Sequence, residues 1–272
     1  MDNTKKVIIE ASFKDKASAG IKGLGSSTNN LQQNLHNLGQ GMANVGKRMT
    51  VLSGVAIALG AVMGRQVINA AMDAEGAWNK FATVFGDHAE EMAEWVTEIR
   101  QILPSPITAI QRMASGIQDL LIPMGFAKDE AMGMTQETIE LANALAAFND
   151  VPVEQVLEAM ISGFSGMTRP LKQFGIDVPV ERLEAMAVQQ GIVTNNLSEL
   201  DFETRRTVEA QLMLEAAYED STDALEGFDA NQDSALRRTQ DLTARFEDQK
   251  EKLGFALLPI YDEALKAIIP II

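Results

Sequence analysis

The fold of this chain is decided by residues 141–178, LANALAAFNDVPVEQVLEAMISGFSGMTRPLKQFGIDV. The pattern predicts a helix that ends near Phe148 and a second helix capped by Asp150. Pro152 then falls in the first turn of that second helix, where its missing N–H breaks no helical bond. One stripe of the second helix is apolar: Val153, Val156, Leu157, Met160 and Ile161. This spacing is typical of a helix that packs on other helices.

The same stretch ends in a compact set of turn residues. Glycines at a spacing of three loosen the helix, and the runs RPLK and FGI follow them. The complete set is Gly163, Gly166, Arg169, Pro170, Leu171, Lys172, Phe174, Gly175 and Ile176. We expect Leu171, Phe174 and Ile176 to be buried anchors between two helices.

This ordered set of motifs resembles the core of phage tail tape-measure proteins, including those of prophages. The likeness covers roughly residues 67–259, with DAEGAWNKFATVFG at 73–86 near one end and LLP at 257–259 at the other. The resemblance implies a structural protein that fills the tail tube, sets tail length during assembly and is released during DNA ejection. It also implies a place in the tail lumen of the virion, and in the host cytoplasm during assembly.

The resemblance further implies the partners. These are copies of the chain itself, tail-tube, tail-tip or tail-terminator proteins, and assembly chaperones. Proteins of this family are usually far longer than 272 residues, and the sequence stops inside the apolar run 267–272. We therefore expect the chain to be an N-terminal portion of a longer protein, or an unusually short member of the family.

Composition favours an all-α fold. Hydrophobic residues make up 46% of the chain but aromatic residues only 6%, and Ala, Leu and Met dominate, a mixture suited to helix-on-helix packing. The absence of cysteine excludes disulfides, thiolate zinc sites and a cysteine nucleophile. A formal charge of −15 argues against electrostatic binding of nucleic acid. That charge fits either ordinary acidic solubility or repulsion of passing DNA.

We expect a multi-helix central domain at 66–229 between long, coiled-coil-like helices. An N-terminal strand at Lys5–Phe13 and a hinge occupy residues 1–30. A helix with heptad spacing covers 31–65. A C-terminal helix at 230–272 leads toward a region that would set tail length and that is missing or absent here. Inside the central domain we expect helix caps at Asp87, Ser105 and Asp201, and Gly191 just past a helix end.

Residues 31–52 carry apolar side chains at alternating spacings of four and three, the a/d spacing of a coiled coil. The stripe is Leu31, Leu35, Leu38, Met42, Val45, Met49 and Leu52. The positions between them are rich in Asn, Gln and Gly and lack the charged pairs that specify a dimer. The stripe therefore predicts self-association in a multi-chain bundle, or one amphipathic helix packed on its own domain.

Residues 49–72 contain a single charge, Arg65. Ala56, Gly60 and Gly64 are spaced by four, which forms a small-residue face that lets helices approach closely. The uncharged part, residues 49–64, spans about 24 Å as a helix, less than a hydrocarbon core of about 30 Å. This length favours a helix buried in a protein bundle, and the alternative is a membrane-active helix that acts as a pore or in delivery.

The calcium-loop pattern at 229–240 fails at its strictest positions. Asp229, Asn231 and Asp233 match the first ligands, but Ser234 replaces the turn glycine and Gln240 replaces the bidentate glutamate. Roles in turns and helix caps explain the same Asp and Asn residues.

The two histidines, His36 and His88, show no metal-ligand spacing. Nucleophile-elbow, phosphate-loop and dinucleotide motifs are also missing from the sequence. We therefore expect no enzyme activity, no cofactor and no metal in these residues.

Overall fold

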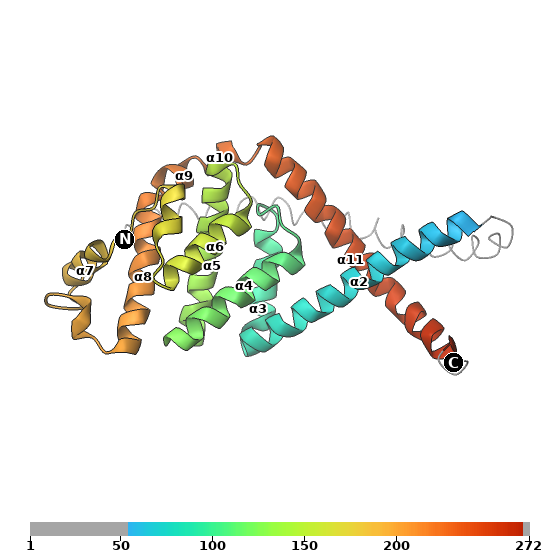
Figure 1. Ribbon diagram of the computed structural model, residues 1–272, viewed down its shortest axis with the longest axis horizontal. Coiled ribbons are helices and arrows are strands. Elements are labelled where there is room, and N and C mark those ends of the chain that lie inside the picture. Colours follow the sequence, from blue (N-terminus) through green and yellow to red (C-terminus); the bar gives the residue numbers. More distant parts are fainter. Residues whose placement is uncertain (1–53, 269–272) are drawn as a thin grey trace. The chain divides into compact units, whose positions relative to one another are not determined.

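The computed structural model of this chain describes residues 54–268, and all regular secondary structure in this range is helical, without a strand (Figure 1). Within that range it describes all side chains except those of 54–64, 229–230 and 259–268. The predicted all-α class is confirmed for this part of the chain. The strand predicted at Lys5–Phe13 and the heptad stripe Leu31–Leu52 lie outside the described residues.

Four of the helices within residues 54–268 are long: α2 (Gly54–Phe85), α5 (Lys128–Asn149), α8 (Phe202–Asp220) and α11 (Ala235–Ile268). Six are shorter: α3 (Ala89–Ile99), α4 (Ile107–Leu121), α6 (Val153–Phe164), α7 (Val180–Gln189), α9 (Thr222–Glu226) and α10 (Phe228–Asn231). Short 3₁₀ helices lie between them: η2 (Gly86–His88), η3 (Ile122–Met124), η4 (Arg169–Phe174) and η5 (Leu197–Glu199).

The chain divides into two compact units. The larger unit is Gly76–Arg245, and the other combines Met1–Glu75 with Phe246–Ile272. Both α2 and α11 contain a division point, so each long helix contributes to both units. The domain bounds at 66–229 stay a prediction from the sequence.

Helix α5 forms the centre of the larger unit. Residues 141–147 are buried without interruption, because α4, α6, α9 and α10 all pack against α5. A helix that is apolar on every side is buried on every side. The one polar residue in this run is Asn143, which is fully buried and therefore needs hydrogen-bond partners inside the protein.

Helices α4 and α6 begin one and two residues later than the sequence suggested, each directly after a proline. Pro106 is the N-cap of α4 and Pro152 is the N-cap of α6, and neither cap makes a side-chain hydrogen bond. The predicted capping roles of Ser105 and Asp150 are therefore wrong. A proline lacks the N–H that the first turn leaves unpaired, and its restricted φ suits the extended N-cap backbone, so no polar cap is needed.

Asp150 has a different role from the expected one. It ends α5 in the left-handed conformation, at φ 53°, and accepts a hydrogen bond from Ser234 Oγ at 2.6 Å. Asp87 also makes no cap, because α3 begins after His88. Two other predictions are confirmed: Asp201 accepts hydrogen bonds from the first backbone N–H groups of α8, and Gly191 follows α7 at φ 73°.

The smaller unit contains a very close helix crossing. Gly254 of α11 lies against Val67 and Ala71 of α2, and a Cβ added at Gly254 would lie 2.2 Å from the Val67 carbonyl oxygen. Ala71 is fully buried at this contact, and Ile68 beside it is 5% exposed. A small residue on each helix therefore sets the separation of the two backbones.

We expect Gly254→Ala to destabilise this crossing by about 1–3 kcal/mol, because the added methyl group overlaps backbone that cannot rotate away. The matched control is Gly133→Ala in α5, where an added Cβ meets nothing within 4 Å. That change should stabilise the chain by about 1 kcal/mol through helix propensity. Urea unfolding of both variants measures the difference, and equal effects would contradict a tight crossing.

Candidate functional site

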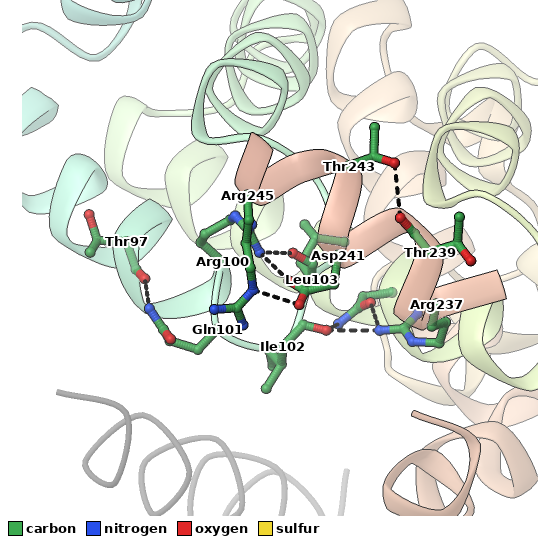
Figure 2. Close-up of polar contacts among 11 residues, drawn as sticks. Thr97, Arg100, Gln101, Ile102, Leu103, Arg237, Thr239, Asp241, Thr243 and Arg245 are labelled. Carbon is green, nitrogen blue, oxygen red and sulfur yellow. Dashed lines mark hydrogen bonds and ion pairs between the residues drawn. The ribbon is translucent and has the colours of Figure 1, made fainter. Parts of the chain in front are cut away.

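The most distinctive polar site lies where α11 meets the corner after α3, which we define as residues 100–103 (Figure 2). We define the arginine clamp as Arg100, Asn143, Arg237 and Asp241. Arg237 is 4% exposed, and its Nη2 donates to the Ile102 carbonyl at 2.8 Å and to Asn143 Oδ1 at 2.9 Å. Burial lowers the pKa of Arg237 to about 10, so the side chain is charged at neutral pH.

Asn143 completes this half of the clamp. Its Nδ2 donates to the same Ile102 carbonyl at 3.4 Å, so the Asn143 amide is hydrogen-bonded to both Ile102 and Arg237. The guanidinium of Arg237 also lies over the Phe228 ring, 5.9 Å from its centroid. A desolvated cation is thus held by a neutral amide, a carbonyl and an aromatic face.

The second half of the clamp is an ion pair. Arg100, 7% exposed, donates from Nη1 to Asp241 Oδ1 at 3.0 Å, and Asp241 Oδ2 accepts from Arg245 at 2.7 Å. Burial alone would raise the pKa of Asp241, but hydrogen bonds from Arg245 and Arg100 lower it below its ordinary value. Its stabilising contribution is therefore present at neutral pH and is lost as pH falls through that lowered pKa.

A small groove of about 200 Å³ lies beside the clamp, between α11 and the starts of α4 and α6. Its lining is Pro104, Ser105, Pro106, Val153, Glu154, Arg237, Thr239, Gln240, Thr243 and Ala244. On the side of the groove formed by the starts of α4 and α6, Ser105 Oγ donates to Glu154 Oε1 at 3.4 Å. The hydroxyls of Thr239 and Thr243 donate to carbonyls of their own helix, so the groove offers few free polar groups.

The second candidate site is the elbow, which we define as residues 163–176. Leu171 and Ile176 are fully buried and Phe174 is 7% exposed, as the sequence predicts. A Cβ added at Gly163 would meet Leu171 Cδ1 at 2.8 Å and Met213 Sδ at 3.3 Å, so the elbow packs tightly on α8. Its apolar residues hold the core together.

The other residues of the elbow motif lie at its surface. Arg169 and Lys172 are exposed, and Lys172 pairs with Asp177 at 3.0 Å. Gly166 and Gly175 have φ values of 84° and 82°, a conformation that glycine adopts without strain. The expected RPLK turn is the 3₁₀ turn η4, with Pro170 near its start.

The remaining sequence candidates are placed only in part. Ala56, Gly60 and Gly64 fall in α2, where the structure gives the backbone but not these side chains. Among the described residues, no helix combines the length and apolar character that crossing a membrane requires. The self-association stripe at 31–52 lies before the first described residue.

Among residues 65–228 and 231–258, whose side chains the structure describes, no group of three or more potential ligand side chains could hold a metal ion. His88 lies beside two acids, with Nε2 3.0 Å from Asp129 and Nδ1 3.5 Å from Glu91. Asn231 is the last residue of α10, so this part of the calcium-like pattern is helical.

The arginine clamp was not identified from the sequence. Its members lie on α5, on α11 and in the corner after α3, and only the fold brings them together. One signal was available: Asn143 interrupts the apolar run LANALAA, and a polar residue there must find a buried partner. The partner itself had no local signal.

Comparisons with known proteins return no match: no family model, no curated protein and no solved structure is similar to this chain.

Proposed function

We propose that this chain belongs to the phage or prophage tail tape-measure proteins. The observation that carries the proposal concerns the elbow. The residues by which the sequence resembles that family fold into one compact unit whose apolar members are buried in the core. The motif is therefore a packing motif, which suits a structural protein better than a catalytic one.

The architecture supports an elongated assembly. In this proposal a central multi-helix domain stands between long, coiled-coil-like flanking helices, with a short strand near the N-terminus. Helix α11 has 34 residues and would span about 50 Å as a straight rod. Leu242 and Phe246 on this helix are 69% and 67% exposed, and such apolar side chains are suited to contacts with other chains.

The proposed role is to fill the tail tube, to set tail length during assembly and to leave the tube during DNA ejection. The proposed partners are copies of the chain, joined through Leu31–Leu52, together with tail-tube, tail-tip or tail-terminator proteins and assembly chaperones. A net charge of −15 suits a lumen through which DNA passes without binding. The proposal includes no enzymatic activity and no cofactor.

Phage assembly tests this proposal directly. A stop codon in the gene for this chain should leave filled heads but few or no tails of defined length in electron micrographs. The same gene supplied from a plasmid should restore the tails. Tails of unchanged number and length in the mutant would overturn the proposal. Genes for a major tail protein and assembly chaperones directly upstream would agree with it.

The alternative function is membrane activity through residues 49–72. It is favoured by the uncharged run 49–64 and by the small residues Ala56, Gly60 and Gly64. Liposome leakage by the purified chain, compared with a Gly60→Asp variant, separates the two functions. Strong leakage that is lost in the variant would support a pore or delivery protein. Little leakage from either protein would favour the tape-measure role.

A further inference from the structure

The first three turns of α11 bury little apolar surface. Among residues 235–245, Ala244 is the buried apolar residue at 1% exposure, while Leu242 is 69% exposed. Helix α6 in the same unit buries Val153, Val156, Leu157, Ala159, Met160 and Phe164. Apolar burial is the usual reason that a helix stays docked, so a different interaction must hold residues 235–245.

The arginine clamp supplies that interaction. Arg237 and Asp241 are one helical turn apart on α11, and both contact the corner at 100–103. Arg237 reaches the Ile102 carbonyl, and Asp241 reaches Arg100 (Figure 2). These contacts are directional and involve charges, so they are lost together once the helix moves by a few ångströms.

The packing beneath the helix is incomplete. The groove of about 200 Å³ separates α11 from Pro104, Pro106 and Val153 on the body of the unit. The groove is a surface groove, so α11 does not pack directly on the body of the unit along it. A helix held over such a groove loses few van der Waals contacts when it lifts.

We propose that residues 235–245 form a strap that detaches from the larger unit when the arginine clamp opens, while α3 to α8 stay folded. Such an opening is a local unfolding event, in which one segment moves without the core. It would expose the groove walls and free the start of α11 for another contact. Higher ionic strength should favour opening of the strap, because Asp241 is partly exposed and salt therefore screens its ion pair with Arg100. This inference does not depend on the tape-measure proposal.

Hydrogen exchange of the full chain, read by mass spectrometry, tests the strap. We expect the backbone amides of residues 239–245 to exchange about 100-fold faster than those of residues 141–147 in α5. Asp241→Asn should accelerate exchange in the strap about tenfold, the loss expected for a hydrogen bond between charged groups, and leave α5 unchanged. Added salt should act in the same direction on the strap alone.

Arg245→Gln is the matched control. It removes the other arginine bound to Asp241, but Arg245 lies on α11 itself and does not reach the corner. Its effect on strap exchange should be less than about twofold. Arg100→Gln is the second variant, and it should reproduce Asp241→Asn. Strap and α5 amides that exchange at one rate, or variants that accelerate both equally, would overturn the proposal.

Discussion

Phe174→Ala is expected to lower the free energy of unfolding of the full chain by about 3–5 kcal/mol. The ring is 7% exposed and stands between the fully buried Leu171 and Ile176 in the elbow. Removing it takes away the apolar surface of a whole ring and leaves a cavity next to tightly packed neighbours. Gly163 shows how little free space there is, because an added methyl group would already overlap Leu171.

The control for Phe174 is a phenylalanine at the surface. Phe202 is 64% exposed and lies beside Arg205 and Arg206, with guanidinium-to-centroid distances of 5.9 Å and 5.7 Å. Phe202→Ala should cost about 1 kcal/mol or less. Urea denaturation followed by circular dichroism measures both variants. Equal midpoints for the two variants would mean that the elbow is a docking surface and not a core element.

The helical order of the middle of the chain could be predicted because its signals are local. Apolar residues at spacings of three and four marked the buried face of α6. Of the predicted stripe, Val153, Val156, Leu157 and Met160 are buried, and Ile161 is half-buried. Glycine and proline marked the breaks. Helix starts were less well predicted, since a proline and a neighbouring polar residue both suggest an N-cap. At Ser105–Pro106 the proline occupies the cap itself.

The long helix α11 shows what periodicity leaves open. The sequence predicts a C-terminal helix at 230–272, and the structure has α11 at Ala235–Ile268. Leu242 and Phe246 are four residues apart and therefore lie on one face of this helix. Both side chains are nonetheless exposed, at 69% and 67%. Spacing identifies a face of a helix, but only the fold determines what covers that face.

The arginine clamp could not be predicted from spacing for a related reason. Arg100 and Asp241 are 141 residues apart, and Asn143 and Arg237 are 94 apart. On the sequence alone, arginines and acids in helices are ordinary solvated residues. Burial of Arg237 at 4% exposure depends on the packing of α5, α11 and the corner after α3. These contacts carry no local signal.

Asn143→Ala is expected to lower the free energy of unfolding by about 3–4 kcal/mol. Asn143 is fully buried and accepts a hydrogen bond from the charged Arg237 at 2.9 Å. Losing a hydrogen bond to a charged group costs about 1.5–3 kcal/mol, and the missing amide leaves a small cavity. The guanidinium would then stay buried with fewer partners, which is the more costly consequence.

Arg237→Met separates the cost of the lost hydrogen bond from the cost of the buried charge. It removes the charge and keeps an unbranched side chain of similar length. The Ile102 carbonyl would still accept from Asn143 Nδ2. We expect this change to cost less than Asn143→Ala, about 1–2 kcal/mol. The double variant should cost about 1 kcal/mol less than the sum of the two single changes, because both single changes break the same Arg237–Asn143 hydrogen bond. The difference is reduced because the Ile102 carbonyl then loses both of these donors. Additive effects in urea unfolding would contradict a shared hydrogen bond. A coupling of the expected size would identify Asn143 of α5 as the residue that makes the buried Arg237 of α11 tolerable.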